Sequence, residues 1–251
     1  MKNFIIKNRW LGFLLTTGFL FQIGCSVLER TPKIASGVNY PDQFEAVVTK
    51  KSTLKYLIYL PDNFNESSEK FPVVMFLHGS GERGDDVNKV KVNGPPMLVE
   101  KGRKFPFILV SPQCPDNKWW DADELKQLLD NVVKTYSGDE NRIYVTGLSM
   151  GGFGTWDLLT KYPNYFAAAV PVCGGGEPRT TRLIGKTPVW AFHGAKDDVV
   201  PYQRSEEMVN TLNSFGGNAK LTIYPEANHN SWDQTYNNQE VYDWMLSQKL
   251  K

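Results

Sequence analysis

Short apolar runs alternate with helical patterns along the chain from Phe44 to the C-terminus. Most of these runs are continuously apolar, which is typical of strands in a parallel sheet that is covered on both faces. The predicted strands are residues 44–50, 53–60, 73–77, 107–111, 142–146, 167–172, 189–192 and 220–224. The predicted helices are residues 121–136, 150–161, 202–215 and 235–249.

The order of these elements predicts the fold class. Strands that alternate with helices favour an α/β protein with a doubly wound, mostly parallel sheet flanked by helices. The first two predicted strands are expected to pair antiparallel around a turn. The chain has 251 residues, 41% of them hydrophobic, which is enough for one large core. We find no internal repeat and expect a single domain over residues 43–251.

The N-terminus has the pattern of an export signal. Lys2, Lys7 and Arg9 precede an apolar run over residues 10–24, which is short for a membrane-spanning helix. Gly24 and Cys25 resemble a bacterial lipobox, in which the cysteine is lipidated, although Gln22 departs from that pattern. We therefore expect a signal over residues 1–25 and a tether over residues 26–42. We therefore predict an exported bacterial lipoprotein that is attached to a membrane through lipidated Cys25. Its predicted location is the periplasm, the outer membrane or the cell surface. An ordinary cleaved signal and an uncleaved anchor stay open as alternatives.

The composition of the chain says little about which molecules the protein binds. The chain carries 28 Lys and Arg against 27 Asp and Glu, and this net charge of +1 gives no electrostatic reason to expect nucleic acid as a partner. Two further cysteines, Cys114 and Cys173, allow a disulfide in an oxidising compartment, and two free thiols are an equal alternative. No cluster of His and Cys indicates a metal, and the predicted chemistry needs no cofactor. The oligomeric state is left open.

A candidate nucleophile follows the predicted strand at 142–146. Gly147-Leu148-Ser149-Met150-Gly151 has the form G-x-S-x-G between a strand and a helix. In such a turn the serine lies at a strained apex, and glycines flank it because side chains there would collide with the backbone. We predict that Ser149 is the nucleophile and that the N–H of Met150 binds an oxyanion.

The base and the acid follow from chain order, which is Ser, acid, His in folds with this nucleophile turn. Only three histidines are present, and His229 alone follows a candidate acid. We expect His78 to serve another part of the site and His193 to form local hydrogen bonds in a turn. Asp197 and Asp198 both follow the strand at 189–192, and Asp197 matches the acid of an H-G-x-x-D-x-V-V-P pattern that resembles small carboxylesterases. Asp197 is therefore the favoured acid, and Glu226 is at the wrong position.

A loop of small residues follows the strand at 73–77. In this type of fold that loop supplies the second oxyanion donor through a backbone N–H. We select Ser80, with Gly81 as the alternative. Glu82 and Arg83 are expected to form an ion pair that holds the loop, and a contact of Arg83 with a substrate carboxylate is the alternative.

Several motifs together resemble one group of bacterial esterases. They are LHGSGERG at 77–84, SPQCP at 111–115, KWW at 118–120, GLSMGG at 147–152, VCGGG at 172–176, AFHGAKDDVVP at 191–201 and HNSW at 229–232. The group is the feruloyl-esterase and polyhydroxybutyrate-depolymerase-like branch of the α/β hydrolases, whose members also carry the labels "predicted peptidase" and phospholipase/carboxylesterase. The resemblance implies the α/β-hydrolase fold and a serine carboxylesterase acting on small esters or on polysaccharide-linked feruloyl or acetyl esters.

The predicted site is open. Cap domains of this fold usually follow the strand after the nucleophile helix, and here only residues 173–187 separate that strand from the next. We therefore expect no large cap, and a lipase is disfavoured. Trp119, Trp120 and Trp232 are candidate substrate-binding residues because they offer flat aromatic faces; packing in the core is the equal alternative. A serine peptidase of the same fold and a non-catalytic carbohydrate-binding surface protein are the rival functions.

Overall fold

The computed structural model describes residues 51–66 and 68–250 of the chain. The predicted signal with Cys25, the predicted tether and the predicted strand at 44–50 lie outside the described residues. Within the described residues, no helix combines the length and the apolarity that a membrane crossing requires.

In the part of the chain that the structure describes, seven strands form one sheet in the order β1-β3-β2-β4-β5-β6-β7. β1 pairs antiparallel with β3, and the other neighbouring pairs are parallel. The strands are β1 (Tyr56–Tyr59), β2 (Phe71–Leu77), β3 (Ile108–Pro112), β4 (Gly138–Leu148), β5 (Ala168–Val172), β6 (Val189–Gly194) and β7 (Ala219–Tyr224). The predicted doubly wound, mostly parallel sheet is confirmed.

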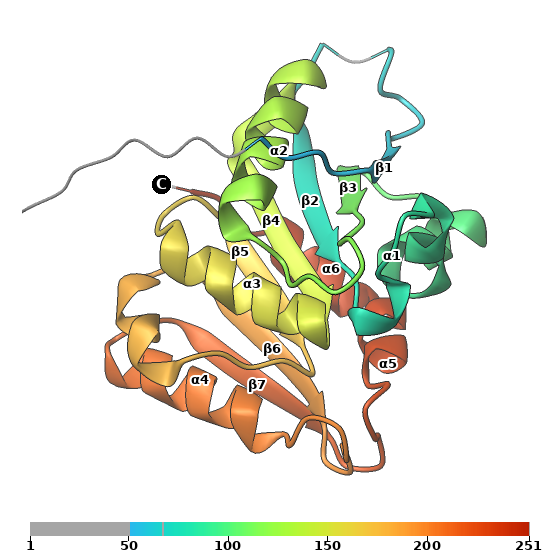
Figure 1. The fold of residues 1–251 in the computed structure, drawn as a ribbon. Helices are drawn as coiled ribbons and strands as arrows, with labels where there is room; N and C mark the ends of the chain where they lie inside the picture. The colour runs from blue at the N-terminus through green and yellow to red at the C-terminus, as the bar shows by residue number, and fades with distance from the viewer. Residues whose placement is uncertain (1–50, 67, 251) are drawn as a thin grey trace, which may run out of the picture. The chain divides into compact units, whose positions relative to one another are not determined.

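Helices cover both faces of this sheet (Figure 1). The α-helices are α1 (Gly94–Glu100), α2 (Ala122–Thr135), α3 (Met150–Lys161), α4 (Gln203–Ser214), α5 (Trp232–Asn237) and α6 (Gln239–Leu246). The 3₁₀ helices are η1 (Ser80–Glu82), η2 (Val87–Val92) and η3 (Pro178–Leu183). Side chains alternate between the faces along each strand. In β2, Met75 therefore packs in the core under α2, α3 and α4, whereas Phe76 packs in the core that α1, α5 and α6 cover.

Two helical regions differ from the sequence prediction. Helix α1 was not predicted because it begins with Gly94-Pro95-Pro96, a sequence that usually marks a loop. The predicted helix at 235–249 begins earlier and is divided into α5 and α6 at Asn238. The backbone of Asn238 is extended, and its side chain accepts the N–H of Glu240 at 3.0 Å, so it caps the second helix.

The parallel strands bring distant segments to one edge of the sheet. Ser80 follows β2, Ser149 follows β4, Asp197 follows β6 and His229 follows β7. In an open α/β sheet this carboxyl edge is where ligands bind. The connection from β5 to β6 contains only the short helix η3, so the predicted lack of a large cap in this connection is confirmed.

Candidate active site

Ser149 lies on a sharp turn between β4 and α3. Its φ of 51° and ψ of −117° are unusual for a residue with a side chain, and such strain is typical of a nucleophile elbow. The turn crosses β2 so closely that a Cβ on Gly151 would lie 1.9 Å from the carbonyl oxygen of Leu77. The N–H of Ser149 donates to the carbonyl of Val172 at 3.0 Å, which fixes the turn against β5.

The structure brings Ser149, His229 and Asp197 into one hydrogen-bonded row. His229 Nε2 lies 3.0 Å from Ser149 Oγ, and His229 Nδ1 lies 2.8 Å from Asp197 Oδ2. Because a carboxylate only accepts, the Nδ1 position carries the proton and Nε2 is left to accept the serine hydroxyl proton. This arrangement has the geometry by which an imidazole activates a serine for nucleophilic attack.

Asp197 is held from several sides, whereas Asp198 is exposed. The Asp197 side chain is fully buried, and its Oδ1 accepts the N–H groups of Val199 at 2.9 Å and Val200 at 2.8 Å. Burial acts to raise the pKa of Asp197, but the hydrogen bonds from His229, Val200 and Val199 outweigh it, so the pKa lies below its ordinary value. Asp197 is therefore ionised at neutral pH.

His193 is a second histidine on the same carboxylate. Its Nε2 lies 3.0 Å from Asp197 Oδ2 and 2.8 Å from the carbonyl oxygen of Val200, and its Nδ1 lies 2.8 Å from the hydroxyl of Ser205. Both partners of Nε2 only accept, so Nε2 carries a proton. Burial lowers the pKa of His193. The neutral ring of His193 therefore holds Asp197 in place. The sequence analysis expected His193 to form hydrogen bonds only within its turn, but the ring also contacts Ser205 in α4.

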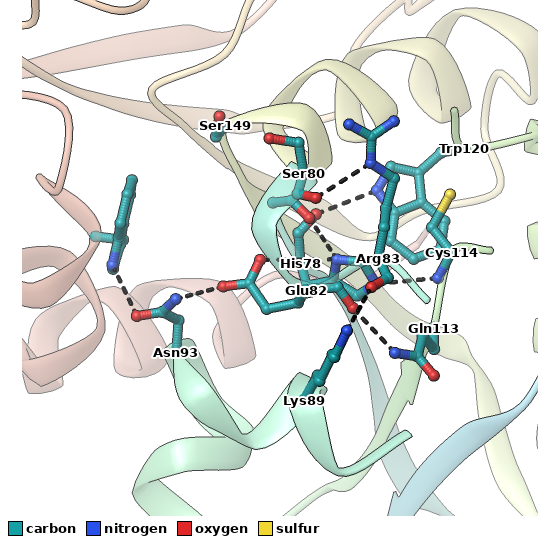
Figure 2. Close-up of polar contacts among 12 residues, drawn as sticks. His78, Ser80, Glu82, Arg83, Lys89, Asn93, Gln113, Cys114, Trp120 and Ser149 are labelled. Atoms are coloured by element: carbon teal, nitrogen blue, oxygen red, sulfur yellow. Dashed lines mark hydrogen bonds and ion pairs between the residues drawn. The ribbon is translucent and has the colours of Figure 1, made fainter. Parts of the chain in front are cut away.

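The loop after β2 lies beside the nucleophile. Figure 2 shows Ser80 next to Ser149, and Met150 is the first residue of α3. Ser80 and Met150 therefore both lie close to Ser149. His78 fixes this loop through two hydrogen bonds of its ring. Its Nε2 accepts the N–H of Cys114 at 3.0 Å, and its Nδ1 lies 2.6 Å from the carbonyl oxygen of Gly79.

The expected ion pair between Glu82 and Arg83 is not what the structure shows, because the two side chains have different partners. Arg83 donates to the carbonyl oxygens of Ser80 and Lys118, each at 3.1 Å, and so ties the loop to the segment before Trp119. Glu82 is only 7% exposed and accepts a hydrogen bond from the side chain of Asn93 (Figure 2).

The three predicted substrate-binding tryptophans have different environments. Trp119 is 65% exposed and contacts Phe153 edge-to-face, with ring centroids 6.2 Å apart. Trp232 is half-buried and lies edge-on to His229, with centroids 5.3 Å apart. Trp120 is only 9% exposed, and its indole N–H donates to the carbonyl of His78 at 3.2 Å. For Trp120 this burial favours the alternative that the sequence analysis left open, in which the ring packs in the core.

Cys114 and Cys173 are both buried and free, which settles the alternative between a disulfide and two thiols in favour of thiols. Burial raises the pKa of Cys173 to about 12, so this thiol stays protonated. Ligand atoms of Cys173, Asp197 and His229 lie within 4.8 Å of one another, a grouping that metal sites also show. Here the hydrogen bond between Asp197 and His229 accounts for two of them, and the Cys173 sulfur accepts the Ser149 N–H at 3.3 Å.

Comparison with known proteins agrees with the fold. A family model described as "Dienelactone hydrolase family" matches residues 115–243, just over half of the chain. The bifunctional acetylxylan esterase/xylanase XynS20E of Neocallimastix patriciarum is 27% identical over 156 residues, which are 59% of this chain and 22% of that protein. Poly(3-hydroxyalkanoate) depolymerase C of Paucimonas lemoignei is 29% identical over 127 residues, which are 39% of this chain and 31% of that protein.

Among solved structures, one described as a thermostable esterase superposes with a TM-score of 0.68 at 34% identity. The match covers 78% of this chain and 59% of that one. The chain spans between about a fifth and a third of the length of the two curated relatives above.

Proposed function

Because this chain belongs to the dienelactone hydrolase family, we propose that it is a serine carboxylesterase acting through an acyl-enzyme. The observation that carries the proposal is the pair of distances that join His229 to Ser149 and to Asp197, at 3.0 Å and 2.8 Å. In the proposed mechanism, Ser149 attacks the ester carbonyl while His229 takes its proton. Asp197 holds the imidazole in the required tautomer and stabilises the imidazolium that forms.

The proposed oxyanion donors are the backbone N–H groups of Met150 and Ser80. They would stabilise the negative charge that develops on the carbonyl oxygen, a contribution of about 3–4 kcal/mol for one such donor in comparable enzymes. His229 then protonates the leaving alcohol, and water repeats the cycle to release the acid. None of these steps calls on a metal or a cofactor.

The proposed substrates are acyl esters on polysaccharide side chains, feruloyl or acetyl. The printed names of several relatives, among them acetylxylan esterases, support a polysaccharide ester. The exposed ring of Trp119 supports a binding face for a flat group such as a sugar or an aromatic acid. Export and lipidation of Cys25 remain part of this proposal, and one relative described as a secreted protein is consistent with export.

Replacement of the nucleophile tests the reaction. We expect Ser149→Ala to lower kcat on 4-nitrophenyl acetate by roughly 10⁶, the loss seen when a comparable triad loses its serine. The exposed Ser214 at the end of α4 provides the control, because Ser214→Ala leaves the site intact. Turnover by S149A near the level of S214A would refute the assignment of the nucleophile.

A pair of substrates tests the acyl group. The purified chain is assayed on methyl ferulate and on 4-nitrophenyl acetate under the same conditions. A clear preference for the ferulate indicates that the aromatic acid lies against an aromatic surface of the site. Activity on the acetate alone indicates a small acyl pocket and deacetylation of polysaccharide. Cleavage of peptides but not of either ester would replace the esterase proposal with a peptidase.

A further inference from the structure

Two hydrogen bonds connect the loops on either side of Ser149. The amide nitrogen of Asn93 donates to Oε1 of Glu82, and the indole N–H of Trp232 donates to Oδ1 of Asn93 at 3.2 Å. Figure 2 shows the first of these hydrogen bonds, between the side chains of Asn93 and Glu82. Glu82 belongs to the loop of Ser80, and Trp232 follows the loop of His229. We call these three residues, Glu82, Asn93 and Trp232, the bridge.

The local sequence frees Asn93 for this role. Asn93 occupies the N-cap position of α1, where an asparagine side chain usually accepts a backbone N–H of the first turn. The second and third helical residues are Pro95 and Pro96, which have no N–H to offer. The Asn93 side chain forms no cap hydrogen bond. The side chain is therefore free to contact the neighbouring loops, while the backbone of Asn93 is fixed at the start of α1.

Both ends of the bridge lie close to groups of the proposed reaction. The Trp232 ring is edge-on to the His229 ring, with an interplanar angle of 86°. At the other end, Glu82 Oε2 lies 3.3 Å, and the Cβ of Ser149 lies 3.6 Å, from the point that a Cβ on Gly79 would occupy. The bridge thus spans the site from the oxyanion side to the base side.

Glu82 and Trp232 need opposite hydrogen-bonding groups from the residue between them, and an asparagine provides both. A buried carboxylate needs a donor, and an indole N–H needs an acceptor. The amide of Asn93 supplies one of each. His78 Nδ1 lies 3.9 Å from the Glu82 carboxylate, but burial lowers the pKa of this histidine, so its ring is neutral at pH 7. A second carboxylate at position 93 would face the Glu82 carboxylate and repel it.

We propose that Asn93 is a positioning residue that couples the Ser80 loop to the His229 loop through the bridge. This inference rests on the proposed function, because the two loops are taken to hold the oxyanion donor and the base. Asn93 contacts neither reacting atom. Its loss should therefore lower kcat, which depends on the alignment of the two sides, and should leave KM nearly unchanged.

The test is a reversal of polarity within the bridge. Asn93→Asp places two carboxylates together, and we expect kcat to fall roughly tenfold to a hundredfold with KM within about threefold of the wild type. In the double variant Glu82→Gln/Asn93→Asp, the new amide donates to the new carboxylate, which still accepts from Trp232. We expect kcat of the double variant to exceed that of N93D by about tenfold. Asn210→Asp, on the exposed side of α4, controls for the added charge.

A second measurement needs no turnover. The indole N–H resonance of Trp232 is identified by its loss in Trp232→Phe, and its exchange with D₂O should be faster in Asn93→Ala than in the wild type. Unchanged exchange in N93A, wild-type kcat in N93D, or a double variant no better than N93D each overturns the bridge. If the wild type hydrolyses no ester while exchange in N93A is faster, the bridge is present, but the proposed function and the coupling assigned to Asn93 both fail.

Discussion

Asp197 and Asp198 are adjacent in the sequence but differ in what surrounds them. Asp197 accepts from His229 and from two backbone N–H groups, whereas Asp198 is exposed. We expect Asp197→Asn to lower kcat by about 10⁴, because an amide favours the wrong imidazole tautomer, as in serine proteases. Asp198→Asn is the matched control and should stay within about twofold of the wild type, since surface substitutions rarely cost more. Equal losses in the two variants would contradict the assignment of the acid.

Trp119 and Trp120 form a second matched pair. We expect Trp120→Ala to lower the free energy of unfolding by about 3–5 kcal/mol, because this ring is 9% exposed and packs between the loop and α3. Trp119→Ala should change that free energy by less than about 1 kcal/mol, since its ring is 65% exposed. Urea unfolding of both variants measures the difference. If W119A proves the more destabilised of the two, the burial argument is wrong.

What the sequence can predict at this scale depends on whether a residue has a local signal. Ser149 has a motif, and His229 follows by elimination from three histidines. Nothing in the sequence indicates which of Trp119 and Trp120 is buried. The directions of adjacent side chains outside regular secondary structure depend on tertiary packing. Asn93 and Glu82 were missed as a pair, since no pattern in the sequence relates them and their contact depends on how α1 meets the loop after β2.

At the scale of elements, the site depends on how closely α3 approaches β2. We expect Gly151→Ala to unfold the elbow or to abolish activity, because its Cβ would lie 1.9 Å from the Leu77 carbonyl oxygen. Gly81→Ala is the control. A Cβ on Gly81 meets no atom within 4 Å, and the backbone N–H is kept. The measurements are the thermal midpoint and kcat on 4-nitrophenyl acetate. Normal activity in G151A would show that this crossing can relax.

The elements themselves differ in how well the sequence predicts them. Helix α3 begins at Met150 and ends at Lys161 as predicted, because the elbow fixes its start. Helix α1 is stabilised by its place in the fold rather than by its sequence, since Leu98 is buried in the same core cluster as Phe76. The division at Asn238 was missed because an apolar periodicity continues across it.

For the whole molecule, the parallel order of the strands is what assembles the site. Ser149 and His229 are 80 residues apart in the chain, yet a hydrogen bond joins them at 3.0 Å. This convergence is predictable once the fold class is known, because the carboxyl ends of β2, β4, β6 and β7 share one edge. The exact pairing of β1 with β3 was not predictable, since the sequence indicated only an antiparallel hairpin.

Two buried histidines make the stability of the whole molecule depend on pH. His78 and His193 are both 0% exposed, and burial lowers the pKa of each. In the unfolded chain each regains an ordinary pKa near 6.5, so the unfolded state binds more protons below that pH. Their contribution to stability is therefore complete above about pH 6.5 and decreases as the pH falls, by at most about 1.4 kcal/mol per pH unit for each histidine.

Urea unfolding between pH 7.5 and 5 tests this dependence. We expect the free energy of unfolding to decrease over this range in the wild type. His193→Gln keeps an N–H donor near Asp197 but has no ionisable ring. Its free energy of unfolding should therefore depend less steeply on pH, because only His78 still contributes. The ordinary pKa values of aspartate and glutamate, about 4, lie below this window. A stability that stays constant or rises as the pH falls would show that His78 and His193 are protonated within the fold, and the neutral tautomers assigned to both rings would have to be withdrawn.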